Sequence, residues 1–251
     1  MTPPKTLASS VLVGASQDAQ AFKVLELTLA QVHLRYDSVL TIPVLNNFDP
    51  TFAPLQAQKV ASGGRAAAWY VQLSSLEGVL RQFRRGGVIA HLVSERYFWT
   101  GLARTRSFAE FDLLRILWLA GLPVPRPLGA AVWRKWFTYR AAVLTQRIPD
   151  AKPLGKRSEP AVWFAAGFVV AQMHQFGVWH ADLNVFNLLV DAQDKVWLID
   201  LDRGRQNGLT EVLRAENLSR LLRSLRKVCP ELEDSCWGAF KQGYQSLNLN
   251  V

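Results

Sequence analysis

The sequence of 251 residues predicts an α+β fold of two lobes, with a small β-rich lobe over residues 1–147 and a mainly helical lobe over residues 148–251. Short β-rich runs joined by a turn, most clearly at residues 69–83, mark the first lobe. A polar connection, QRIPDAKPLGK at residues 146–156, sets the expected boundary. Beyond it, residues 160–175 carry a helical pattern of apolar side chains.

The clearest element of the first lobe is a hairpin. Residues 1–60 are weakly patterned, and we expect short strands and loops there. The runs WYVQL (69–73) and VLRQF (79–83) then flank the polar turn SSLEG. Two β-rich runs joined by a short polar loop predict an antiparallel hairpin.

A glycine-bearing turn, which includes Gly63, Gly64 and Arg65, precedes this hairpin. Glycine lets backbone N–H groups approach a phosphate closely, so the turn is a candidate phosphate contact. Taken alone, these residues are equally well explained as an ordinary hairpin turn.

Residues 107–119 predict the single helix of the first lobe, because their apolar side chains fall on one side. Ser107 is the expected N-cap, and Glu110 three residues later would complete a capping box. Gly121 and Pro123 end the helix.

Two further elements frame the boundary between the lobes. The run AAVLT at residues 141–145 predicts a buried strand. After the polar connection, residues 160–175 predict a helix that Gly177 closes.

The composition is that of a folded domain, with 49% hydrophobic and 20% charged residues. The N-terminus lacks the features of a signal peptide, and no apolar stretch reaches the roughly 20 residues that cross a bilayer. We therefore expect a cytoplasmic protein that attaches to membranes only peripherally. Cys229 and Cys236 have no second Cys/His pair beside them, and we expect them to be reduced and structural.

A formal net charge of +9 indicates an acidic partner, such as a nucleic acid, an anionic membrane or a phosphorylated substrate. Basic residues gather in two segments, from Arg81 to Arg106 and from Arg203 to Lys227. Ordinary solvated faces account for these segments equally well.

The strongest chemical signal is the segment HADLNVFNLLVDAQDKVWLIDLDR, residues 180–203. The apolar runs LLV and VWLI, joined by the turn DAQDK, predict a second hairpin. Because the entry of the first strand and the exit of the second lie side by side, Asp182, Asn187 and Asp200 are expected to converge. Asp202 could assist there or pair with an arginine at the surface, either Arg203 or Arg205.

Such a convergence is suited to phosphoryl transfer. One carboxylate accepts the proton of an attacking hydroxyl, while oxygen ligands hold magnesium against a triphosphate. Magnesium usually takes one or two carboxylates and completes its shell with phosphate and water, so a sparse set of ligands is expected.

The pattern HxDLxxxN, followed thirteen residues later by ID, resembles the catalytic and metal-binding loops of protein kinases and of kinases for small molecules. The sequence GVWHADLNVFNLLV, together with VWLIDLDRG, is most similar to the 3-deoxy-D-manno-octulosonic acid (Kdo) kinase family of Gram-negative bacteria. The segments GGRAAAW, VLRQFRRGG, FAEFDLLRILWLAGLPVPRP and ENLSRLLRSL agree in order, so the resemblance covers about residues 60–245. It implies the two-lobed protein-kinase-like fold.

The resemblance also implies roles for single residues. Asp182 corresponds to the general base, His180 to the residue that braces the catalytic loop, and Asn187 and Asp200 to the metal ligands. Ala181 stands where regulated protein kinases carry arginine, so control by activation-loop phosphorylation is not expected.

The nucleotide-binding part departs from the usual kinase pattern. Glu110 corresponds to the helix glutamate, but Arg81 takes the place of the strand lysine that this glutamate anchors, with Arg84 as the alternative. The sequence Gly64-Arg65-Ala66 replaces glycine-x-glycine in the phosphate-covering loop.

The function implied is transfer of phosphate from ATP, with Mg²⁺, to a hydroxyl of Kdo on a lipid A precursor, the 4-hydroxyl by family. The partners expected are this anionic glycolipid and the cytoplasmic face of the inner membrane, and no nucleic acid. A heptose kinase of the same pathway and an aminoglycoside-type kinase are alternatives, of which a basic chain disfavours the latter. Because the strand lysine is missing, a pseudokinase-like binding module is an alternative function from another class.

Overall fold

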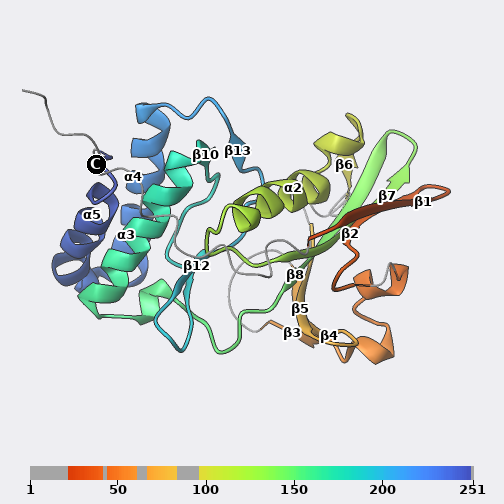
Figure 1. The fold of residues 1–251 in the computed structure, drawn as a ribbon, viewed down its shortest axis with the longest axis horizontal. Coiled ribbons are helices and arrows are strands. Elements are labelled where there is room, and N and C mark those ends of the chain that lie inside the picture. Colours follow the sequence, from red (N-terminus) through yellow and green to blue (C-terminus); the bar gives the residue numbers. More distant parts are fainter. Residues whose placement is uncertain (1–21, 42–43, 61–66, 84–95, 250–251) are drawn as a thin grey trace, which may run out of the picture.

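The computed structural model describes residues 22–41, 44–60, 67–83 and 96–249 of the chain (Figure 1). Strands dominate its N-terminal part and helices dominate its C-terminal part, so the predicted two-lobed α+β fold is confirmed. The boundary between residues 147 and 148 stays a prediction.

The N-terminal part is built on an antiparallel sheet of eight strands in the order β1-β2-β7-β8-β5-β4-β3, with β6 paired to β8. Strands β4 and β5 form the predicted hairpin, with Gln72 opposite Glu77. The strands are β1 (Val24–Leu29), β2 (Val32–Asp37), β3 (Gln58–Lys59), β4 (Ala67–Gln72), β5 (Glu77–Gln82), β6 (Tyr97–Phe98), β7 (Pro127–Lys135) and β8 (Thr138–Gln146).

Helix α2 (Arg106–Leu119) packs against β7 and β8 and joins the two parts of the molecule. Phe108 and Phe111 enter the core beneath the sheet, whereas Leu114 and Leu117 belong to the core of the C-terminal part. The helix therefore belongs to the hydrophobic cores of both parts.

The predicted capping box at the start of α2 is wrong. The N-cap is Thr105, and no side chain caps the helix. Ser107 is buried inside the first turn, where its hydroxyl donates to the carbonyl oxygen of Ala131 at 3.0 Å. The Glu110 carboxylate bonds Arg81 on the sheet. Both side chains that the sequence pattern assigned to a capping box are therefore hydrogen-bonded to residues of the sheet instead.

The C-terminal part consists of three helices and short β-ribbons. Helix α3 runs from Pro160 to Gln175 as predicted, and Gly177 follows it with a φ of +69°. The other elements are α4 (Glu211–Val228), α5 (Gly238–Gln245), β9 (Lys152–Pro153), β10 (Val178–Trp179), β11 (Leu188–Val190), β12 (Val196–Leu198) and β13 (Arg205–Gln206).

Single turns of 3₁₀ or π helix connect these elements. They are η2 (Leu45–Phe48), η3 (Ala53–Leu55), η4 (Leu102–Arg104), η5 (Leu154–Lys156), η6 (Pro230–Leu232) and η7 (Glu233–Trp237). Cys229 and Cys236 are both buried free thiols. None of the helices in the described ranges is both long and apolar enough to cross a bilayer.

Helices α3 and α5 pack backbone against backbone, and two glycines permit this approach. A Cβ atom on Gly167 would lie 2.0 Å from the carbonyl oxygen of Phe240, and one on Gly243 would lie 1.9 Å from that of Phe164. No side-chain rearrangement relieves such contacts because both partners are backbone atoms.

A buried polar cluster ties the same helices to α4. The His174 Nδ1 atom lies 2.7 Å from the Tyr244 hydroxyl, and its Nε2 atom lies 3.2 Å from Asn217 Oδ1. Since the Asn oxygen only accepts, the ring carries its proton on Nε2 and is neutral. Burial lowers the pKa of His174 to about 4, although the hydrogen bond to Asn217 opposes the shift.

The close contact at Gly167 predicts that Gly167→Ala changes the stability in the opposite direction from the same substitution in an open helix. In an open helix this change stabilises by up to about 1 kcal/mol. Here we expect the free energy of unfolding to fall by about 3 kcal/mol, because α3 and α5 must separate. Chemical denaturation measures it, and Gly238→Ala, where an added Cβ meets nothing within 4 Å, is the matched control and should be neutral or stabilising. Equal stabilities of the two variants would contradict the close packing.

The buried neutral ring of His174 predicts loss of stability in mild acid. Below pH 6.5 this histidine binds a proton in the unfolded chain, whereas in the folded chain it binds one only near pH 4. The free energy of unfolding therefore falls as the pH falls through this window. Between pH 7 and 5 the contribution is roughly 2 kcal/mol. His180 shifts in the same direction, so the comparison with His174→Gln isolates this ring. The same pH dependence in both proteins would refute the assignment.

Candidate active site

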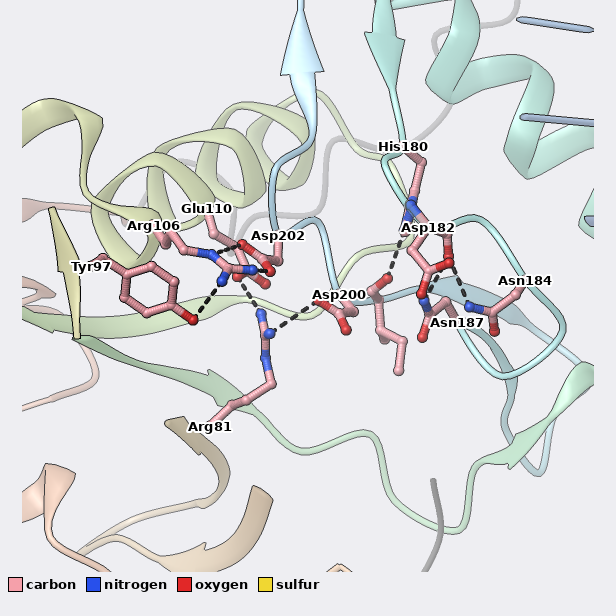
Figure 2. Close-up of polar contacts among 11 residues, drawn as sticks. Arg81, Tyr97, Arg106, Glu110, His180, Asp182, Asn184, Asn187, Asp200 and Asp202 are labelled. Atoms are coloured by element: carbon pink, nitrogen blue, oxygen red, sulfur yellow. Dashed lines mark hydrogen bonds and ion pairs between the residues drawn. The ribbon is translucent and has the colours of Figure 1, made fainter. Parts of the chain in front are cut away.

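The predicted hairpin of β11 and β12 brings two loops together. Leu188 pairs with Leu198, so the residues just before β11 and just after β12 are neighbours. The amide of Ile199 donates to the carbonyl oxygen of Asn187 at 3.0 Å. Asp200 follows directly with a φ of +58°, which turns its backbone away from the strand. Figure 2 shows the resulting group of polar side chains.

His180 joins the two loops through its ring. Its Nε2 donates to the carbonyl oxygen of Ile199 at 3.0 Å, and its Nδ1 accepts from the amide of Asp182 at 3.1 Å (Figure 2). Burial lowers the pKa of His180, which keeps the ring in the neutral form that can both donate and accept. The histidine therefore sets the backbone on both sides of the site.

Asp182 is held by its backbone, and its carboxylate faces outward. Its carbonyl oxygen accepts from the side-chain amides of Asn184 and Asn187, each at 2.9 Å. The carboxylate is 66% exposed, and among the described residues Arg220 Nη1 on α4 contacts it at 3.3 Å. A fixed backbone with an accessible carboxylate is the arrangement that a general base needs.

Asn217, on α4, is a support that the sequence did not reveal. Its Oδ1 accepts from the amide of His180 at 3.0 Å, and its Nδ2 donates to the carbonyl oxygen of His180 at 2.7 Å. The Asn217 Oδ1 atom also accepts from His174 Nε2. The buried polar cluster of the helices thus continues into the loop before β11.

Arg81 on β5 lies between the carboxylates of Glu110 and Asp200 (Figure 2). It bonds Glu110 Oε2, and its Nη1 lies 3.1 Å from Asp200 Oδ1. Its guanidinium also covers the Phe83 ring at 4.7 Å. The predicted residues on the sheet, on α2 and on the second loop therefore meet at one cation.

The surrounding charges shift the pKa values of Arg81 and Glu110. Burial alone would lower the pKa of Arg81, but the carboxylates of Glu110 and Asp200 raise it, so the guanidinium stays charged. Burial, opposed by Arg81 and aided by Asp200, raises the pKa of Glu110 to about 7. The Asp200 charge beside the Arg81–Glu110 pair therefore favours the protonated form of Glu110.

Asp202 bonds Arg106 rather than Arg203 or Arg205, so that predicted pairing is wrong. Arg106 Nε donates to Asp202 Oδ1 at 2.7 Å, and its Nη1 donates to the Tyr97 hydroxyl at 2.6 Å. Arg106 is the first residue of α2, so this pair fixes the second loop to the helix start.

Asn187 and Asp200 were predicted as metal ligands, and their oxygens suit that task. Asp200 Oδ1 is buried and has no hydrogen-bond partner among the described residues, because the Arg81 contact is an ion pair without hydrogen-bond geometry. Asn187 directs its amide nitrogen to Asp182 and leaves its oxygen for a cation. In the described ranges no group of three or more His, Cys, Asp or Glu could hold a metal. The oxygens of one Asp and one Asn match the sparse set of ligands that Mg²⁺ usually takes from a protein.

Four residues of the predicted nucleotide site lie outside the described residues. They are Gly63, Gly64, Arg65 and Arg84. Phosphate covering by this loop stays a prediction, as does the alternative of Arg84 for Arg81.

Comparison with known proteins identifies the family of this chain. The family model described as "Lipopolysaccharide kinase (Kdo/WaaP) family" matches residues 51–244. Over 185 residues the chain is 44% identical to a 3-deoxy-D-manno-octulosonic acid kinase of Xylella fastidiosa (strain M12), covering 72% of this chain and 74% of that protein.

Two further relatives carry the same name. The protein of Xanthomonas axonopodis pv. citri (strain 306) is 44% identical, and that of Stenotrophomonas maltophilia (strain R551-3) is 43% identical, with the same coverage of both chains. The family model spans most of the chain, including both loops and α2. On these grounds the chain belongs to the lipopolysaccharide kinase (Kdo/WaaP) family.

Proposed function

We propose that this protein transfers the γ-phosphoryl group of ATP to a hydroxyl of Kdo in a lipid A precursor, and that the 4-hydroxyl is the acceptor. The observation that carries the proposal is the exposed carboxylate of Asp182 beside the oxygens of Asn187 and Asp200. The substrate class comes from the name shared by relatives at 43–44% identity.

In this proposal Asp182 accepts the proton of the attacking hydroxyl. The hydroxyl oxygen forms the new bond to the γ-phosphorus, the bond from that phosphorus to the bridging oxygen breaks, and ADP leaves. His180, Asn184 and Asn187 fix the backbone of Asp182, so the carboxylate needs little reorganisation. Arg220, which approaches this carboxylate, lies where it can attract an anionic acceptor.

Asn187 and Asp200 would hold Mg²⁺, which when bound neutralises charge on the β- and γ-phosphates. The Asp200 Oδ1 atom supports this role, because it makes an ion pair with Arg81 but no hydrogen bond, and a carboxylate oxygen is a hard ligand that Mg²⁺ prefers. Arg81, held by Glu110, takes the role of the strand lysine. Its planar fork can bond a phosphate oxygen while it keeps its carboxylate partner.

The proposed location is the cytoplasmic face of the inner membrane. The acceptor is an anionic glycolipid, and a chain with a formal net charge of +9 is attracted to an anionic surface. The arginine-rich composition therefore supports binding to both the substrate and the bilayer that contains it.

The proposal predicts a Mg²⁺- and ATP-dependent product on a Kdo-bearing lipid A precursor, detected by mass spectrometry as one added phosphate. Asp182→Asn should lower kcat by roughly 10²-fold or more, with little change in ATP affinity, because the proton acceptor is lost while the nucleotide contacts remain. Fragmentation of the product locates the phosphorylated hydroxyl.

Asp150→Asn is the matched control, because Asp150 is an exposed aspartate on the connection between the two parts. A heptose-bearing lipid is the competing acceptor in the same assay. Phosphate on the heptose alone would overturn the Kdo assignment. Binding of the lipid without any turnover would favour the hypothesis of a pseudokinase-like binding module.

A further inference from the structure

The tip of the hairpin between β7 and β8 breaks the usual rule for tight turns. Lys135 pairs with Thr138, so the turn contains only two residues, Trp136 and Phe137. Two-residue turns favour Asn and Gly because positive φ values are required. Trp136 has a φ of +56°, a strained conformation for so bulky a side chain.

Packing does not explain these two aromatic residues. Trp136 is 79% exposed and Phe137 is 80% exposed. Neither turn chemistry nor a core contact accounts for them, and such a violation of local rules is typical of functional positions. The hairpin projects at the end of the molecule opposite α5 (Figure 1).

A third exposed ring lies beside this turn. Phe98 on β6 is 72% exposed and pairs with Thr138. The next residue, Trp99, donates its amide to the carbonyl oxygen of Phe137 at 2.9 Å. Three large apolar side chains therefore gather at one end of the sheet, where scattered single exposures would be ordinary.

Next to these rings lies a basic hollow of about 190 Å³. Four of its lining residues are cations, and no carboxylate lines it among the described residues; the cations are Arg96, Arg134, Lys135 and Arg140. The guanidinium of Arg134 lies 4.6 Å above the Trp99 ring, which orients it while leaving its charge available to an anion. The hollow therefore suits a phosphate group.

We propose that this end of the sheet is the surface on which the protein docks to a bilayer of anionic phospholipids. Trp136, Phe137 and Phe98 enter the interface, and three cations of the hollow bind lipid phosphates: Arg96, Arg134 and Lys135. Exposed aromatic rings next to Lys and Arg are the combination that binds an interface, since rings supply apolar area and cations supply attraction to acidic lipids.

The docking surface is connected to the active site. The Tyr139 hydroxyl, on β8, accepts from the amide of Arg106 at 3.2 Å. Arg106 in turn bonds Asp202, two residues after the proposed metal ligand Asp200. Docking would therefore set the orientation of the catalytic loops over the membrane, a purpose that rests on the proposed function.

The test is flotation of the full chain with vesicles of phosphatidylcholine, with and without phosphatidylglycerol. We expect binding that requires phosphatidylglycerol and weakens with added salt. Trp136→Gly with Phe137→Ser should lower binding about tenfold, although glycine suits the positive φ at the first turn position and should preserve or raise thermal stability. Lys135→Glu should lower it by roughly tenfold as well, because it reverses one charge beside the hollow.

Lys227→Glu is the matched control, since it changes the net charge equally at an exposed site on α4. Unchanged binding of the hairpin variant, an equal effect of Lys227→Glu, or no binding of the native chain to acidic vesicles would each overturn the inference. Binding only to vesicles that contain the Kdo-bearing precursor would instead assign the hollow to substrate phosphates.

A water-soluble, deacylated Kdo acceptor separates this inference from the proposed function. The hairpin variant should phosphorylate it at the native rate. A protein that binds acidic vesicles but never phosphorylates a Kdo acceptor refutes the proposed function alone. Phosphorylation of the soluble acceptor without any vesicle binding refutes the docking surface alone.

Discussion

The position of one buried cation, Arg81, determines how the rest of the site is arranged. Its guanidinium comes from the sheet, its first carboxylate partner Glu110 comes from α2, and its second, Asp200, comes from the loop after β12. A buried charge is tolerated only when it is paired, so the three elements must stay together. Because α2 also enters both hydrophobic cores, this ionic contact links the two parts of the molecule.

A second layer of buried polar groups supports the loop before β11, the proposed catalytic loop. Asn217 bonds both backbone groups of His180, and the His180 ring bonds the loops on either side. Each of these groups is fully occupied inside the protein. The Asp182 carboxylate, in contrast, is 66% exposed and has Arg220 beside it. Buried supporting groups and an exposed carboxylate are therefore neighbours in one short segment.

Local signals in the sequence predicted the elements that depend on neighbours in the chain. Proline and glycine marked both ends of α3, and two apolar runs with a turn marked the β11–β12 hairpin. The capping pattern of Ser107 and Glu110 misled because tertiary partners took both side chains. Asn217 and Arg106 gave no signal, since their partners lie 37 and 96 residues away in the sequence.

The most direct test of the central ion pair is a double-mutant cycle on kcat/KM for ATP, with Arg81→Ala, Glu110→Gln and the double variant. If Arg81 acts through its bond to Glu110, the double variant should be about as impaired as Arg81→Ala alone, with a coupling of about 2 kcal/mol or more. Arg84→Ala is the control and should retain most activity. Additive losses, or an equal loss from Arg84→Ala, would contradict the account.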